Sequence, residues 1–173
     1  MNLKESIRSI PDWPIQGVIF RDLTTLMQSP EAFRESCDLL FERYKNMNID
    51  KIVGIDARGF VFGGVLAYRL GIGFVPVRKK GKLPCETIEE SYSLEYGEAT
   101  LEMHVDAIAP GERVVIVDDL IATGGTVGAT VKMVRKLKAD LVECAFIVEL
   151  PDLKGRDKIP DCRVFSLCEF EGE

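Results

Sequence analysis

The stretch Val114–Thr130 reads VVIVDDLIATGGTVGAT, and it decides the fold that we expect. Its first four residues, Val114–Val117, are all β-branched, which is typical of a strand covered on both faces of a parallel sheet. Two acids follow, then a turn of small residues, and apolar residues recur at helical spacing over Val127–Leu137. The sequence therefore predicts a strand, a loop and the N-terminus of a helix.

The loop of this unit suits a phosphate group. Its small residues, Ala122–Thr126, let several backbone N–H groups converge at the positive end of a helix dipole. We call these residues the phosphate loop. The preceding acid pair, Asp118 and Asp119, suits sugar hydroxyls or a metal, because a purely structural turn avoids the cost of desolvating two carboxylates. The string matches neither GxxxxGK[ST] nor GxGxxG, so the fingerprints of nucleoside triphosphate and dinucleotide sites are missing.

The composition is typical of one reduced, cytoplasmic domain. The chain has 173 residues, 46% of them hydrophobic, and we expect a single domain over 1–173. Its formal net charge of −6 disfavours nonspecific binding to nucleic acid. Five cysteines without a CxxC pair and a single histidine argue against a disulfide framework and against structural zinc. The sequence has no recognisable signal peptide and no apolar run long enough to cross a membrane, so we expect no membrane partner.

Two further loops are expected at the same edge of the sheet as the phosphate loop. Lys51–Ile55 is a predicted strand that turns through Asp56–Gly59 into a helix, and Arg58 in this turn is either a surface charge or a phosphate ligand. Ile72–Val77 is the next predicted strand, and it runs into the basic loop 78–82, which is either a solvated face or a collector of polyanions. Because the carboxyl ends of parallel strands meet at one edge, the three loops together suit a sugar phosphorylated at both ends.

The N-terminal segment does not belong to the strand and helix alternation. Leu3, Ile7 and Ile10 have a spacing that predicts a short amphipathic helix, which Pro11 ends. Pro11–Asp22 is too irregular for a regular element and too apolar for a solvated linker. It is either an ordered loop that covers something or a plug at the edge of the core. A helix with Ser29 as its N-cap follows.

A hairpin is expected before the central strand. Ser91–Tyr96 and Ala99–Val105 both alternate between polar and apolar residues, with a turn at Gly97 and Glu98. The alternation directs Thr100, Glu102 and His104 away from the apolar face, so we expect His104 to be exposed and without a catalytic role. From this pattern alone, Glu95 is an exposed hairpin residue.

Two last strands, Leu141–Leu150 and Arg163–Cys168, complete the predicted sheet. Strands that alternate with helices predict an α/β fold, with a doubly wound, mainly parallel sheet flanked by helices. The hairpin and the N-terminal segment are attachments to this sheet.

Six strings, spread from about Ile7 to Phe170, carry a resemblance to a known family. They are PDWPIQGVIFRDLT, IDARGFVFG, RKKGKLP, SYSLEYG, VVIVDDLIATGGT and VELPDLKGR. The fifth resembles the signature of the type I phosphoribosyltransferase family, and the set resembles its adenine-specific branch. The resemblance implies the family's fold, with a small hood segment at about 1–30 and the hairpin as a flexible loop. It also implies a purine salvage enzyme that makes AMP and pyrophosphate from adenine and phosphoribosyl pyrophosphate. Mg²⁺ on the sugar substrate and a homodimer complete this expectation.

The resemblance assigns roles to residues at matching positions. The ribose and its 5′-phosphate are assigned to Asp118, Asp119, Ala122, Thr123, Gly124, Gly125 and Thr126. Pyrophosphate is assigned to Ala57, Arg58, Arg78, Lys79 and Lys82, with Arg78 acting either in cis or across a dimer interface. Adenine is assigned to Ile19, Phe20, Arg21 and Leu150, of which Phe20 stacks on the base. The catalytic residues are Glu95, Tyr96 and Arg58, with Glu95 near N7 of the base and Tyr96 closing over the sugar. No metal ligand is assigned directly to the protein, although Asp118 or Asp119 can reach Mg²⁺ through water.

Two other functions stay open on the sequence. A regulator that retains the sugar site and binds nucleic acid needs a basic surface or an added DNA-binding domain, and this short acidic chain has neither. A transferase for a 6-oxopurine places a donor or a lysine near position 6 of the base, where this chain offers backbone and apolar packing. The base that is turned over distinguishes the two transferases.

Overall fold

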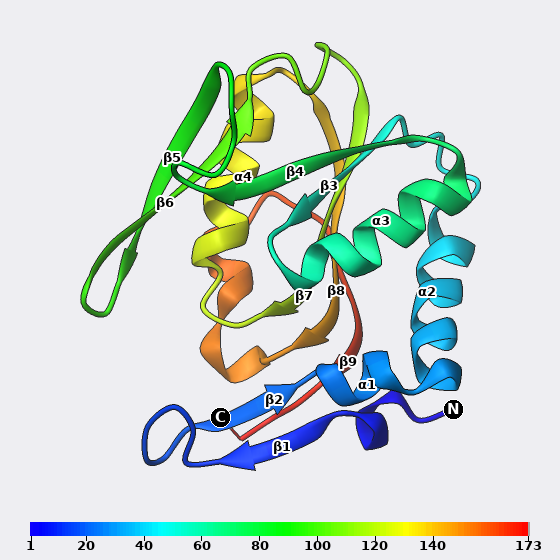
Figure 1. Ribbon diagram of the computed structural model, residues 1–173, viewed down its shortest axis with the longest axis vertical. Helices are drawn as coiled ribbons and strands as arrows, with labels where there is room; N and C mark the ends of the chain where they lie inside the picture. The colour runs from blue at the N-terminus through cyan, green and yellow to red at the C-terminus, as the bar shows by residue number, and fades with distance from the viewer. Residues whose placement is uncertain (173) are drawn as a thin grey trace.

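The computed structural model describes residues 1–172, and its centre is a seven-stranded sheet in the order β5-β6-β4-β3-β7-β8-β9 (Figure 1). The strands are β3 (Lys51–Ile55), β4 (Gly73–Lys79), β5 (Thr87–Leu94), β6 (Gly97–His104), β7 (Arg113–Ile121), β8 (Asp140–Glu149) and β9 (Val164–Glu169). Strands β3, β4, β7, β8 and β9 run parallel, whereas β5 and β6 form an antiparallel hairpin at one edge. The predicted mainly parallel sheet and the predicted hairpin are both confirmed. The turn of the hairpin was predicted at Gly97 and Glu98, but it lies at Glu95 and Tyr96, because Leu94 pairs with Gly97.

Helices cover both faces of this sheet. Figure 1 shows α2 (Pro30–Tyr44) and α3 (Arg58–Leu70) on one side and α4 (Gly125–Lys136) on the other. The central strand β7 contributes to both cores. Val115 and Val117 pack in the apolar cluster under α2 and α3, and Val114 and Ile116 pack in the cluster under α4. All four are fully buried, which explains why the run of β-branched residues is uninterrupted.

The helix ends follow from local sequence. Ser29 caps α2, because its side-chain oxygen accepts a hydrogen bond from the backbone N–H of Ala32 (3.3 Å), and Pro30 occupies the first helical position. Helix α3 ends at Gly71, whose φ of 70° lies in the left-handed region that favours glycine.

The hood segment differs from its prediction. The helix expected from Leu3 to Ile10 is wrong beyond Ser6, because only η1 (Leu3–Ser6) is helical and β1 (Arg8–Pro11) follows. Strand β1 pairs with β2 (Ile19–Asp22), which lies inside the stretch predicted to be irregular, and α1 (Thr24–Gln28) comes next. Pairing with a distant segment overrides the local apolar spacing. Figure 1 shows this two-stranded ribbon beside the carboxyl ends of β7 and β8.

The outward face of the hairpin also differs from its prediction. His104 is partly exposed, and its ring Nε2 lies 2.7 Å from the carbonyl oxygen of Pro84. Glu102 was expected to point to solvent, but it is only 7% exposed. Its carboxylate accepts a hydrogen bond from the backbone N–H of Gly81 in the basic loop (3.1 Å), so the basic loop covers it. Within residues 1–172, no helix is both long and apolar enough to span a membrane.

Candidate active site

A cavity of about 540 Å³ opens at the carboxyl ends of β7 and β8. Its lining comes from segment 17–21 of the hood, Arg58, Tyr92 and Leu94 of the hairpin, Asp119 with Leu120, the phosphate loop, and Leu150 with Leu153. The fold thereby brings the predicted adenine residues into one cavity with all of the predicted sugar phosphate residues except Asp118. Ligands of open α/β sheets bind at this edge.

The phosphate loop is shaped by two close approaches of neighbouring chain. Gly124 has a φ of 86°, and a Cβ at this position would overlap the carbonyl oxygen of Gly155. A Cβ on Gly125 would lie 2.6 Å from the ring of Tyr92. Helix α4 begins at Gly125 and has no side-chain cap, so its first backbone N–H groups are available to an anion.

The acid pair lies beside this loop and is buried. The prediction put both acids at the end of the strand, but β7 continues to Ile121, so they lie within it. Asp118 and Asp119 are 8% and 5% exposed, and the backbone N–H of Asp119 donates to Oδ1 of Asp118 (2.8 Å). Burial, and then the charge of Asp119, raise the pKa of Asp118 well above its ordinary value. Asp119 is the member of the pair that lines the cavity.

The N-terminus of helix α3 places a cation next to the acid pair. Its first residue, Arg58, forms an ion pair between its Nε and Oδ2 of Asp119. Burial lowers the pKa of Arg58, but the Asp119 carboxylate outweighs burial and raises it, so the guanidinium stays charged. Gly59 permits this approach, because a Cβ there would lie 2.9 Å from Oδ1 of Asp118. Ala57 is the N-cap of α3, and the first amides of this helix lie next to it.

The hood closes the apolar part of the cavity. Ile19, Phe20 and Arg21 line it from β2, and the largely buried Leu150 lines it from the end of β8. The ring of Trp13 packs edge-on against Phe20, with the centroids 4.5 Å apart. An apolar slot next to an anion site suits a flat base that is attached to a sugar phosphate.

The comparisons with known proteins agree with this geometry. A family model described as "Phosphoribosyl transferase domain" matches residues 22–172. An adenine phosphoribosyltransferase from Desulfosudis oleivorans is 64% identical over 173 residues, with 100% of both chains covered. This chain belongs to the phosphoribosyltransferase family.

Similar solved structures identify the branch of the family to which this chain belongs. The adenine phosphoribosyltransferase of Thermoanaerobacter pseudethanolicus is similar with a TM-score of 0.93 and 48% identity, covering 97% of this chain and 98% of that chain. The adenine phosphoribosyltransferase of Saccharomyces cerevisiae has a TM-score of 0.90 and 43% identity, covering 95% and 96%. It was solved with adenine and an imino-altritol bisphosphate. This phosphoribosyltransferase is thus an enzyme of the adenine-specific branch, which serves purine salvage.

The basic loop of this phosphoribosyltransferase lies outside the cavity. The prediction ended the strand at Val77, but β4 continues through Arg78 and Lys79, because both residues pair with β6. Arg78 donates from Nε to Oδ2 of Asp56 (2.9 Å), and the side chains of Lys79 and Lys82 are exposed. Of the residues predicted to bind pyrophosphate, Arg58 lines the cavity, whereas the residues of the basic loop are absent from its described lining. The structure therefore brings only part of this set to the cavity wall.

The hairpin tip carries two of the three residues that the resemblance identified as catalytic. Glu95 is exposed and lines an adjoining hollow of about 450 Å³ together with Thr123, Gly124 and Gly125. Tyr96 is 89% exposed. Glu95 therefore lies beside the phosphate loop, whereas Tyr96 faces solvent.

Sequence reasoning missed Tyr92 as a site residue of this phosphoribosyltransferase. Tyr92 lines the cavity and packs on Gly125. Burial, and then the charge of Asp118, raise the pKa of its phenol. The alternation in Ser91–Tyr96 places Tyr92 and Leu94 on one face, and that was the available signal. The sequence did not indicate that this face lies over the phosphate loop.

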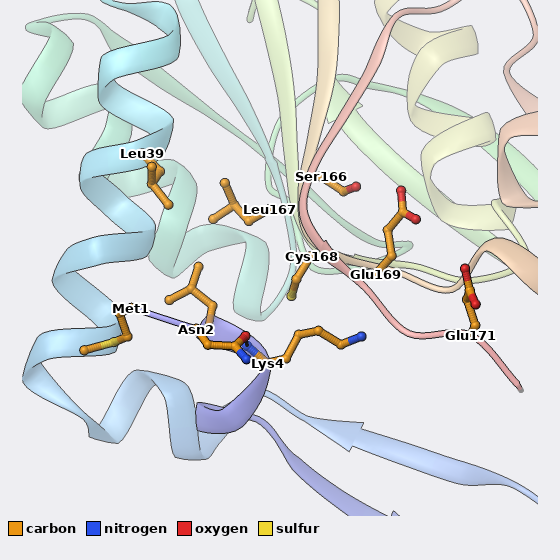
Figure 2. A pocket seen from close by; sticks show the side chains of 10 residues that line it. Met1, Asn2, Lys4, Leu39, Ser166, Leu167, Cys168, Glu169 and Glu171 are labelled. Atoms are coloured by element: carbon orange, nitrogen blue, oxygen red, sulfur yellow. Dashed lines mark hydrogen bonds between the residues drawn. The ribbon is translucent and has the colours of Figure 1, made fainter.

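A larger hollow lies elsewhere and lacks the chemistry of the family. It measures about 810 Å³, and Figure 2 shows the side chains that line it, which come from residues 1–4 at the start of the chain, from α2, and from β9 and the residues after it. Lys4 contributes a cation to this hollow, but Glu169 and Glu171 lie in the same lining, and none of the described residues that line it is a glycine. Charges of opposite sign without a glycine turn do not make an anion cradle. The smaller cavity beside the phosphate loop is therefore the candidate active site.

Proposed function

We propose that this phosphoribosyltransferase catalyses the Mg²⁺-dependent reaction of adenine with phosphoribosyl pyrophosphate to give AMP and pyrophosphate. One observation carries the proposal: a single cavity joins a glycine loop at a helix N-terminus, the buried Asp119 of the acid pair and an apolar slot under the hood. These three parts match a phosphate, a ribose and a base in the order in which they occur in AMP.

The sugar phosphate is assigned to β7 and the phosphate loop. The backbone amides of Ala122–Thr126 and the hydroxyls of Thr123 and Thr126 bind the 5′-phosphate, and the dipole of α4 favours its charge. Asp118 and Asp119 accept hydrogen bonds from the 2′ and 3′ hydroxyls of the ribose. The burial of the acid pair supports this role, because hydroxyl donors compensate its desolvation.

The base is assigned to the hood. Phe20 stacks on adenine, Leu150 packs against the base, and the backbone at Ile19 and Arg21 reads its Watson–Crick edge. The lining supports this assignment, because all four residues border the cavity. Backbone groups are fixed donors and acceptors. A backbone carbonyl opposite position 6 of the purine accepts a hydrogen bond from a 6-amino group and cannot pair with a 6-oxo group, so it favours adenine.

The leaving pyrophosphate is assigned to the cations at the same edge. Arg58 and the amide of Ala57 bind it first, and Arg78, Lys79 and Lys82 close over it from the basic loop. Departure of pyrophosphate from C1 leaves an oxocarbenium-like sugar and adds charge to the phosphate oxygens. Fixed cations stabilise that growing charge, and this is the largest contribution that the chain makes.

The hairpin tip is assigned to proton transfer and closure. Glu95 donates or accepts a proton at N7 while N9 attacks C1, and Tyr96 covers the sugar. Because Tyr96 is 89% exposed, the hairpin tip has to move toward the cavity for this role. Closure excludes water, which otherwise captures the ribosyl cation.

The residues present fit a magnesium ion that is carried by the substrate. Among residues 1–172, no cluster of three or more His, Cys, Asp or Glu side chains is placed to hold a metal by itself. The acid pair offers two carboxylates, and Mg²⁺ typically takes one or two carboxylates together with waters and substrate phosphates. Asp118 or Asp119 would therefore hold the ion through water. When bound, Mg²⁺ neutralises charge on the pyrophosphate.

We further propose a cytoplasmic homodimer in which residues 1–173 form one domain and about 1–30 form its hood. Exposed apolar side chains on two helices support a dimer. Leu39 of α2 and Val61 of α3 are each 41% exposed, and Tyr68 of α3 is 86% exposed. In such a dimer, Arg78 acts either on its own site or on that of the partner subunit.

The test is product formation from each purine base in the presence of Mg²⁺ and phosphoribosyl pyrophosphate. We expect AMP from adenine at a kcat/KM at least 10²-fold above the values for hypoxanthine and guanine, because backbone groups built for one edge reject the other. Preference for hypoxanthine or guanine would favour the 6-oxopurine transferase instead.

A further inference from the structure

We propose that Cys162 and Cys144 form a thiol-modification site, in which Cys162 reacts with a low-molecular-weight disulfide and Cys144 then converts the product into an intramolecular disulfide. The site lies under α4, away from the cavity that is proposed for AMP. It does not depend on the proposed function.

The two cysteines come from neighbouring parts of the sheet. Cys144 lies in β8 and is fully buried, whereas Cys162 is partly exposed two residues before β9. The backbone N–H of Cys144 donates to the carbonyl oxygen of Arg163 (2.9 Å), which is the residue next to Cys162. Both side chains belong to the apolar cluster under α4, so they lie on the same face of the sheet. The backbone contact and the shared apolar cluster place the two cysteines side by side.

A cation lies next to the outer thiol. Arg135, in the last turn of α4, donates from Nη2 to Sγ of Cys162 at 3.5 Å. The interaction with the Cys144 thiol and the charge of Arg135 lower the pKa of Cys162 to about 7, against burial and the charge of Asp161. A thiol whose pKa lies near the ambient pH is the most effective attacking group in disulfide exchange.

The inner thiol has the opposite character. The interaction with Cys162, burial and the charge of Glu143 raise the pKa of Cys144 well above its ordinary value. Cys144 therefore stays a thiol while Cys162 becomes the thiolate. In this arrangement the two cysteines have different tasks. The reactive outer cysteine attacks the external disulfide, and the protonated inner cysteine forms the intramolecular disulfide afterwards.

The remaining cysteines lack this arrangement and serve as internal controls. Burial raises the pKa of Cys37 and of Cys168 to about 11 in each case. Cys85 is exposed after the basic loop. If exposure alone decided reactivity, Cys85 would react first. The local charges and the neighbouring thiol instead make Cys162 the more reactive cysteine.

The chemistry balances with a disulfide of the glutathione type as the oxidant. The Cys162 thiolate attacks one sulfur of the oxidant, forms a mixed disulfide and expels one small thiolate, which takes up a proton from water. The Cys144 thiol then loses its proton and attacks Sγ of Cys162, and the second small thiolate leaves. Two protein thiols are oxidised to one disulfide, and one oxidant molecule is reduced to two thiols.

The experiment treats the full chain with oxidised glutathione at neutral pH and locates the products by peptide mass spectrometry. In the wild type we expect a disulfide between Cys144 and Cys162. In Cys144→Ser we expect one glutathione that persists on Cys162, and in Cys162→Ser we expect no modification of Cys144. Cys85→Ser is the matched control and should form the Cys144–Cys162 disulfide at the wild-type rate.

A second measurement does not depend on replacing a buried residue. The labelling rate of Cys162 by 5,5′-dithiobis(2-nitrobenzoate) should fall as the pH drops through about 7, because the thiolate becomes protonated. Arg135→Met, at an exposed position, should slow this labelling severalfold at neutral pH, because loss of the guanidinium raises the pKa of Cys162 and lowers its thiolate fraction. Modification of Cys85 in preference to Cys162, or a wild type without the Cys144–Cys162 disulfide, would overturn the proposal.

Discussion

Arg58 at the first position of α3 is paired with Asp119 in the central strand β7. The pair holds the cation of the expected pyrophosphate site against an acid of the expected ribose site. In the proposed function, substrate binding exchanges these partners: Asp119 would take the ribose hydroxyls and Arg58 the phosphate oxygens. The ion pair holds both side chains close to their proposed ligands, which lowers the cost of organising the site.

Asp119→Asn should weaken the binding of phosphoribosyl pyrophosphate. Hydrogen bonds to a charged group contribute about 1.5 to 3 kcal/mol, so we expect a loss of affinity of roughly 10-fold to 100-fold. Isothermal titration calorimetry measures it. Asp106→Asn, at an exposed position in a turn, is the control and should bind like the wild type. Unchanged affinity in Asp119→Asn would remove this carboxylate from the ribose site.

Gly125→Ala should impair catalysis without unfolding the protein. The new Cβ would lie 2.6 Å from the ring of Tyr92, so the hairpin must move away from the phosphate loop. We expect kcat/KM to fall about 10²-fold, as for other small displacements of positioning groups. Gly128→Ala is a matched control on the same helix, because its nearest neighbour would be Lys158 at 3.6 Å, an ordinary contact. Similar kinetics in the two variants would show that the approach of Tyr92 to the loop is unimportant.

Glu95→Gln should slow the chemical step and leave measurable activity. Loss of a general acid or base costs on the order of 10² to 10⁴ in rate, whereas stabilisation of the pyrophosphate by the cations stays intact. The measurement is kcat for AMP formation. Glu98→Gln changes an exposed acid across the hairpin turn and should have the rate of the wild type. Equal kcat in both variants would assign Glu95 to the surface, as the pattern alone suggested.

Asp22 should contribute to the pH dependence of stability. Hydrogen bonds from Thr24, and then from Arg8, lower its pKa from 3.8 to about 2. Because the folded pKa lies below the unfolded one, the contribution is fully present above about pH 3.8 and is lost as the pH falls through about 2.

Asp22→Asn should therefore lower the free energy of unfolding by about 1 kcal/mol at neutral pH, since its partner Arg8 is exposed to water. The deficit relative to the wild type should shrink toward pH 2 in urea titrations. Asp106→Asn should show no pH-dependent deficit. A constant deficit for Asp22→Asn at both pH values would mean that the lowered pKa is not its cause.

The elements that could be predicted from the sequence are those whose local residue pattern matches their environment in the folded protein. Val114–Val117 is buried on both faces, so its composition alone identified the central strand and the edge where the site lies. Leu3–Ile10 was mistaken for a helix, because antiparallel pairing of Ile10 with Phe20 is not visible in local spacing. Both errors in the hood arise from this one distant contact.

The candidate site was predictable in part for the same reason. The phosphate loop and the acid pair are consecutive in sequence, so their chemistry could be read directly. Tyr92 and the buried Glu102 could not be recognised, because their roles depend on Gly125 and Gly81 in other segments. Distant packing fixes both side chains, and alternation within one strand does not reveal it.

A crystal structure of this phosphoribosyltransferase with AMP tests the central claim most directly. We expect the 5′-phosphate on the amides of Ala122–Thr126, the ribose hydroxyls on Asp118 and Asp119, and the base between the hood and Leu150. An AMP molecule in the hollow between η1, α2 and β9, with the phosphate loop empty, would contradict the account.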